Sequence, residues 1–140
     1  TAGMGLVCGG RGPVVLTGHV DASWVDDLAT QQSSQGYAFS LGSRSVTWRS
    51  TRSSSILSST CEAEIYAGAM AAQELCWLTY LLTDLGERPR SSPRGELRLA
   101  YVATSANTAD IFTKALQTGD HQRFCTVLGL VPTLPHLLIA

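Results

Sequence analysis

The chain is poor in charge and has no excess of either sign. Only 15% of its 140 residues are charged, and the formal net charge is -1. A tight nucleic-acid binder carries a strong positive charge, so the balance argues against that signature for the whole chain while leaving room for a local basic patch. The 44% of hydrophobic residues suits the core of one globular domain and argues against disorder and against a second domain.

Metal-like cysteine spacing and long apolar runs are also missing. The four cysteines, Cys8, Cys61, Cys76 and Cys125, form no CxxC pair, which predicts free thiols in a reducing compartment. No run is apolar enough to span a membrane, and residues 1–12 lack the charged start and apolar stretch of a signal peptide. Because the chain starts without methionine and ends in apolar residues, we expect it to be the end part of a longer protein.

A long helix is predicted after residue 58. Ser59 or Thr60 suits its N-cap, and Gly86 stands just past its end. Glu62 lies in the first turn, where the helix dipole favours negative charge. Glu64 begins a stripe of small and apolar residues that we expect to face a core, so the two acids should differ; the alternative is that both are ordinary first-turn acids. The stripe comprises Glu64, Gly68, Ala71, Leu75, Leu78, Leu82 and Leu85.

The rest of the chain alternates strand and helix patterns. In chain order these predict a strand at 14–20, a hairpin of 37–41 and 45–48, the long helix, a basic loop at 86–95, a strand at 97–102, and helices at 106–116 and 122–128. Gly42 suits the first central position of a type II′ turn in the hairpin. This order indicates an α/β fold with an antiparallel hairpin at one end of the sheet.

Three acids occupy comparable places in these elements. Asp21 follows the first strand, Glu64 starts the long helix, and Asp110 lies early in the short helix after the last strand. Ligands of open α/β sheets sit at the carboxyl ends of strands. Carboxylates that converge there repel one another unless a hard cation such as Mg²⁺ neutralises them. The spacing alone is a weak indication of such a site.

Several motifs in series make the indication stronger. They are HVDASW at 19–24, SSQGY at 33–37, VTWRS at 46–50, LSSTCEAEIY at 57–66 and ADIFTK at 109–114. Together they resemble the ribonuclease H domain that closes the polyprotein of copia-type retrotransposons. The resemblance implies a linker from the reverse transcriptase at 1–12, a ribonuclease H-like domain at 13–130 and a C-terminal tail at 131–140.

This resemblance implies a nuclease that cuts the RNA strand of an RNA-DNA hybrid with two metal ions. Asp21, Glu64 and Asp110 match three of the family's four carboxylates, which hold Mg²⁺ or Mn²⁺. The implied partners are the hybrid and the reverse transcriptase domain of the parent polyprotein, with no membrane. The implied location is intracellular, in the cytoplasm or nucleus, or in a virus-like particle for an intact element.

The fourth carboxylate of the family is missing. It opens an Asp-Asn motif on a strand after the long helix, and this chain contains no Asp-Asn pair. We therefore expect a ribonuclease H-like mixed sheet that is truncated, because a central strand and the helices after it are missing. Three of its strands should be antiparallel, and the strand at 97–102 should pair parallel with the first of them. Uncovered apolar surface would favour oligomerisation. Metal binding should be weak, and the enzyme inactive or slow.

Weaker candidates flank the hairpin. Arg44, Arg49, Arg52 and Ser54 could contact the backbone of the hybrid, or they could form a solvated basic edge and a polar loop. Lys114 follows Asp110 by one helical turn, which favours a pair on the helix surface. Two function classes remain open: an enzyme or enzyme remnant, and a non-catalytic module that binds a hybrid or is a degenerate retrotransposon remnant.

Overall fold

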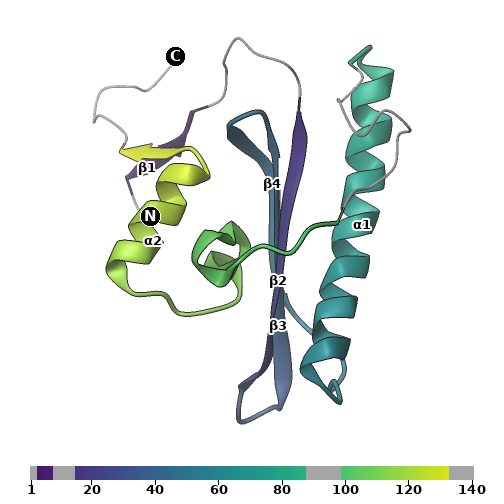
Figure 1. The fold of residues 1–140 in the computed structure, drawn as a ribbon, viewed down its shortest axis with the longest axis vertical. Helices are drawn as coiled ribbons and strands as arrows, with labels where there is room; N and C mark the ends of the chain where they lie inside the picture. The colour runs from purple at the N-terminus through teal and green to yellow at the C-terminus, as the bar shows by residue number, and fades with distance from the viewer. Residues whose placement is uncertain (1–2, 8–14, 88–98, 133–140) are drawn as a thin grey trace.

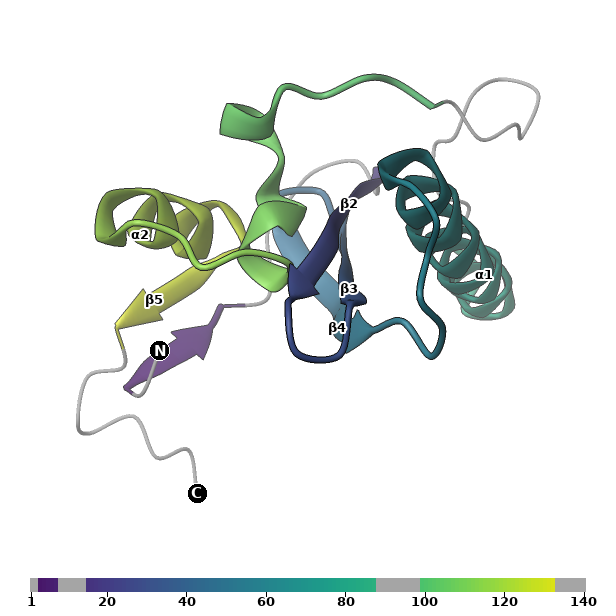
Figure 2. The same ribbon diagram turned by 90° about the horizontal axis from the view of Figure 1, so that it is seen from below.

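The computed structural model describes residues 3–7, 15–87 and 99–132. Its larger sheet consists of β2 (Leu16–Asp27), β3 (Gln32–Leu41) and β4 (Arg44–Arg52), which pair antiparallel in the order β2-β3-β4. Helix α1 covers one face of this sheet, and a group of shorter elements lies on the other face (Figures 1 and 2). This combination of a sheet and helices is compatible with the expected α/β class.

The predicted hairpin is confirmed as β3 and β4. Leu41 pairs with Arg44 across the turn. Gly42 has a φ of 62°, and Ser43 is not among the described residues with positive φ, as a type II′ turn requires. The strands are longer than predicted, because polar and small residues extend the alternating pattern beyond its apolar centre.

The first strand does not end at Asp21, as we expected. Asp21 lies inside β2 and pairs with Gly36 of β3. The strand continues through an irregularity between Ser23 and Asp27, where Val25 takes a φ of 49°. The acid therefore lies within the antiparallel ladder of β2 and β3, with paired residues before and after it in the strand, instead of standing in a loop.

The capped long helix is confirmed as α1 (Thr60–Asp84). The side chain of Ser59 accepts a hydrogen bond from the backbone N–H of Glu62 at 3.2 Å. The carboxylate of Glu62 in turn accepts from the backbone N–H of Ser58 at 2.6 Å. Gly86 follows the end of the helix with a φ of 80°, which suits a glycine.

The buried face of α1 is rotated from the predicted stripe. Ala63, Ala67 and Ala71 are buried with Leu78 and Leu82, whereas Glu64, Gly68 and Leu85 are exposed. Alanines spaced four apart let the helix lie close to the aromatic side chains of β3. The hydrophobic core beneath it consists of Tyr37, Phe39, Ala71 and Leu78, with Leu16, Val20, Met70 and Leu75 packed around it.

The opposite face carries the C-terminal elements. These are the 3-10 helices η1 (Thr104–Ala106) and η2 (Thr108–Phe112), helix α2 (Thr118–Val127) and strand β5 (Leu130–Pro132). Strand β5 pairs antiparallel with β1 (Met4–Leu6) in a small second sheet. The helix expected at 106–116 is thus replaced by shorter 3-10 turns, and the helix expected at 122–128 is present but starts earlier. The small sheet combines Met4–Leu6 of the expected linker with Leu130, the last residue of the expected domain, and the first two residues of the expected tail.

The expected fourth strand is not formed in the described part of the chain. Residues 99–102 have no strand partner there, and residues 97–98, like most of the predicted basic loop, lie outside the described residues. The sheet of β2, β3 and β4 is therefore wholly antiparallel, and our expectation of an added parallel strand is wrong. Strand β2 lies at the edge of this sheet, where the side chain of Asn107 donates to the Val20 carbonyl at 2.9 Å.

Candidate functional site

Two of the predicted acids meet on the face of the sheet opposite α1. Val20 packs against the core beneath α1, so the next side chain, that of Asp21, points to the other face. There it lies beside η2, in which Asp110 is 2% exposed. Burial, and then the negative charge of Asp21, raises the pKa of Asp110 above its ordinary value.

A glycine allows η2 to come this close to the sheet. Gly36 lies opposite Asp21 in β3. A Cβ atom at Gly36 would stand 2.6 Å from Cβ of Phe112 and 3.1 Å from Cγ2 of Thr113. Any larger residue would therefore push η2, and Asp110 with it, away from Asp21.

Asn107 fixes η2 at its other end. Its Oδ1 atom accepts from the backbone N–H of Ala109 at 3.2 Å and so caps the short helix. Its Nδ2 atom donates to the carbonyl of Val20, which directly precedes Asp21 in β2. One side chain thus sets the position of both acids.

Lys114 joins the two carboxylates. Its Nζ atom lies 3.1 Å from Oδ2 of Asp21 and 3.4 Å from Oδ2 of Asp110. The hydroxyl of Thr113 also donates to Oδ2 of Asp21. Oδ1 of Asp110 is buried and, among the described residues, has no hydrogen-bond partner. The expected Lys114 pair with Asp110 exists, but it lies at a buried acid and includes Asp21 as well.

Glu64 lies beside this pair without joining it. Partial burial of its carboxyl group, and then the charge of Asp21, raises its pKa, while Lys114 and a hydrogen bond from the Ala22 amide oppose the rise. Among the described residues, no group of three or more histidine, cysteine or acidic side chains is close enough to hold a metal ion. The structure therefore brings Asp21 and Asp110 together and leaves Glu64 within electrostatic range of both.

The predicted basic residues do not form one patch. Arg44 and Arg52 stand at opposite ends of β4. Arg44 packs beneath Gly129, Arg52 pairs with Asp27, and Arg49 is exposed. Ser54 is also exposed, in the loop that leads from β4 to α1.

Sequence reasoning missed several residues that build the site. Gly36, Asn107 and Thr113 hold the acids in place, and each lies in or within two residues of a motif that resembles those of the family. It also missed Glu74, which accepts hydrogen bonds from the hydroxyls of Tyr37 at 3.2 Å and Thr47 at 2.7 Å. No spacing rule would have found these residues, because their partners are distant in sequence.

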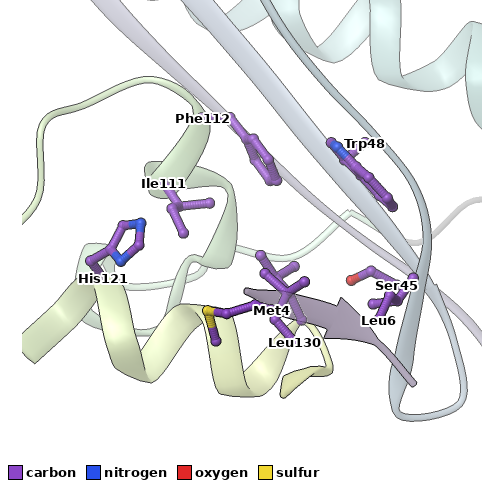
Figure 3. Close-up of a pocket in the computed structure, with 9 residues that line it drawn as sticks. Met4, Leu6, Ser45, Trp48, Ile111, Phe112, His121 and Leu130 are labelled. Carbon is purple, nitrogen blue, oxygen red and sulfur yellow. The ribbon is translucent and has the colours of Figure 1, made fainter. Parts of the chain in front are cut away.

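A separate cavity of about 330 Å³ lies behind η2. Figure 3 shows side chains that approach it from η2, β4, α2 and the small sheet. Its lining is mostly apolar and contains no acid: Met4, Leu6, Ser45, Trp48, Ile111, Phe112, His121, Leu128 and Leu130. Neither Asp21 nor Asp110 lines this cavity.

Comparison with known proteins gives two similar relatives from Arabidopsis thaliana. They are the retrovirus-related Pol polyproteins from transposons RE1 and RE2, each 26% identical over 157 residues that cover 86% of this chain and 11% of the relative. This likeness supports a retrotransposon-derived protein. The aligned length exceeds the 140 residues of the chain, so the relatives contain positions that have no counterpart in this chain.

A further relative covers about half of the chain. The secreted RxLR effector protein 161 of Plasmopara viticola is 38% identical over 68 residues, which are 49% of this chain and 48% of the relative. The chain spans only a small part of the two polyproteins. No family model and no solved structure matches the chain. None of the helices in the described residues is long and apolar enough to cross a membrane.

Proposed function

We propose that the chain is a retrotransposon-derived ribonuclease H-like domain that binds a divalent cation at Asp21 and Asp110 and cleaves RNA-DNA hybrids weakly or not at all. The observation that carries the proposal is the meeting of these two acids. They are distant in sequence, yet Lys114 bridges them at 3.1 and 3.4 Å. Two buried carboxylates repel each other, and the single positive charge of Lys114 offsets only one of their two charges.

The residues present fit a hard cation. Carboxylate oxygens are the preferred ligands of Mg²⁺. Oδ1 of Asp110 is buried without a hydrogen-bond partner in the part of the chain that the structure describes, which leaves one oxygen free to bind. A bound metal would supply Lewis-acid activation of water and of the phosphate. Asp21 and Asp110 would hold it, and Thr113 and Asn107 would keep those carboxylates in place.

The position of Glu64 supports an impaired enzyme. Its carboxylate lies outside the acid pair, and the sequence lacks the Asp-Asn motif of the family that it resembles. Two-metal hydrolysis requires a clamp on both the attacking and the leaving oxygen. The same observation favours the second candidate function, a module that binds a hybrid without cutting it.

A metal-binding measurement tests the site. Mn²⁺ titration followed by the electron paramagnetic resonance of the free ion should show one weak site, with a dissociation constant of about 10⁻³ M. Asp21→Asn and Asp110→Asn should remove it, because each loses a ligand charge with little change of shape. Glu62→Gln is the matched control and should bind as the unmodified chain does. Absence of Mn²⁺ binding to the unmodified chain would contradict the metal site.

Hybrid assays separate the two candidate functions. With Mg²⁺ or Mn²⁺, fluorescence anisotropy should detect hybrid binding that weakens as salt rises, and cleavage should be slow or absent. Efficient cleavage that Asp21→Asn abolishes would overturn the impairment. Hybrid affinity that ignores Asp21→Asn and Asp110→Asn, without cleavage, would favour the binding module. A chain without cooperative unfolding would be a degenerate remnant.

The remaining parts of the proposal concern context. An intracellular location, in the cytoplasm, the nucleus or a virus-like particle, and covalent attachment to a reverse transcriptase domain both follow from the resemblance to the retrotransposon polyprotein. Detection of this sequence within a larger polypeptide by immunoblotting would test the attachment, and fractionation of the cells would test the location.

A further inference from the structure

We propose that Lys114 is a built-in cation that occupies the Asp21 and Asp110 pair and that a divalent cation binds there only by displacing it. This inference rests on the metal site proposed above and adds how that site is regulated. Lys114 is the only lysine of the chain. Its Nζ atom lies within 3.4 Å of both Asp21 oxygens and of Oδ2 of Asp110.

The ammonium group and a divalent cation compete for the same oxygens. Mg²⁺ requires a close, nearly octahedral set of oxygen ligands. Lys114 contacts three of the four carboxylate oxygens of the pair, and the fourth is the partnerless Oδ1 of Asp110 among the described residues. Both cations cannot share these oxygens, since the repulsion between their charges would be unscreened at such short range.

Lys114 is the member of the cluster that can leave. Asp21 is fixed in the ladder between β2 and β3, and Asp110 is 2% exposed. The side chain of Lys114 is 35% exposed, and lysine combines a flexible stem with a strongly hydrated head. Its backbone N–H donates to the Asp110 carbonyl at 3.0 Å, so the chain stays in place while the ammonium group moves into water.

The charge balance favours exchange. One ammonium group faces two carboxylates, which leaves the cluster with an excess negative charge. Oδ1 of Asp110 is buried and, among the described residues, has no partner that would offset its charge. A divalent cation would offset both carboxylates.

The single lysine makes the displacement measurable on the unmodified chain. We would pulse-label amines with acetic anhydride, read the Lys114 peptide by mass spectrometry, and use the α-amine of the same chain as reference. Saturating Mg²⁺ or Mn²⁺ should raise the labelling rate of Lys114 about tenfold or more, whereas NaCl of equal ionic strength should raise it far less. In Asp110→Asn the rate should not respond to the divalent cation.

Lys114→Gln provides the second measurement. It should bind Mn²⁺ about tenfold more tightly than the unmodified chain, because no ammonium group has to be displaced. Arg123→Gln is the matched control: it also removes one positive charge, from the surface pair with Asp120, and should leave Mn²⁺ affinity unchanged. Should Lys114→Gln fail to fold, the labelling experiment stands alone.

The outcomes separate this inference from the metal site itself. Faster labelling together with tighter binding by Lys114→Gln supports it. Equal Mn²⁺ affinity of Lys114→Gln and the unmodified chain, or labelling that stays slow with Mn²⁺ bound, overturns the displacement and leaves the metal site standing. Absence of divalent-cation binding to both proteins overturns both proposals.

Discussion

Buried polar side chains are paired on one face of the sheet and unpaired on the other. On one face Asp21 and Asp110 share Lys114, and the hydroxyl of Thr113 donates to Asp21. On the face beneath α1, Gln35 is 0% exposed, and neither its oxygen nor its nitrogen has a hydrogen-bond partner among the described residues. A buried amide without partners is costly. Gln35 therefore lowers the stability of the fold, whereas the acids on the other face have partners that hold them in place.

Replacing Gln35 should therefore stabilise the chain. We expect Gln35→Met, which keeps the length of the side chain, to raise the free energy of unfolding by about 1 kcal/mol, measured by urea denaturation. Gln73→Met on the exposed face of α1 should change it by less than about 0.5 kcal/mol. A loss of stability in Gln35→Met would contradict this prediction, because it would mean that the Gln35 amide is hydrogen-bonded in solution.

At the scale of elements, the site depends on how closely η2 approaches the sheet. The sequence predicted a regular helix at 106–116, but η2 is a short 3-10 helix whose ends are fixed by Asn107 and Thr113. Contacts to β2 over a large sequence separation, such as Asn107 to the Val20 carbonyl, override the local helical pattern. Gly36 provides the space that these contacts require.

Two glycine substitutions should have opposite effects. Gly36→Ala should lower the free energy of unfolding by about 1–3 kcal/mol, because its Cβ meets Cβ of Phe112, which cannot move without the backbone. Gly68→Ala, in the exposed middle of α1 with nothing within 4 Å of the added Cβ, should raise it by about 0.5–1 kcal/mol. Thermal unfolding of both variants checks this. A neutral Gly36→Ala would show that η2 does not lie against β3 in solution.

At the scale of the whole molecule, β2 and β4 are edge strands that have no further neighbouring strand in the described part of the chain. Strand β2 ends the order β2-β3-β4, and residues 99–102 pass outside the sheet in the described part of the chain. Leu99 is 85% exposed and Tyr101 is 92% exposed. Unpaired edges and exposed apolar side chains favour association between chains.

We expect the chain to self-associate, with an associated fraction that rises as the protein concentration rises. Leu99→Glu combined with Tyr101→Glu should weaken this association about tenfold or more, since each loses apolar contact and adds a charge. Leu28→Glu, a residue of equal exposure to Leu99 in the turn after β2, is the control. Sedimentation velocity over a concentration series measures the effect. The prediction would be contradicted if the chain stayed monomeric at every concentration, or if Leu28→Glu weakened the association as much as the double substitution does.

Local features of this protein could be predicted from the sequence because they depend on neighbouring residues. The Ser59 cap, the end of α1 before Gly86 and the turn at Gly42 all follow from short-range backbone chemistry. The choice of Asp21 and Asp110 as candidates had a different basis, the motifs at 19–24 and 109–114 that resemble those of a known family. Whether they hold a metal stays a prediction.

The tertiary structure alone decided which faces and partners these local features acquire. It turned Ala63 toward the sheet and left Glu64 exposed, because the helix packs through small side chains against the aromatic residues of β3. It also placed Lys114 on Asp21, a partner 93 positions away. Such pairings depend on packing across the whole domain, which short-range backbone preferences do not determine.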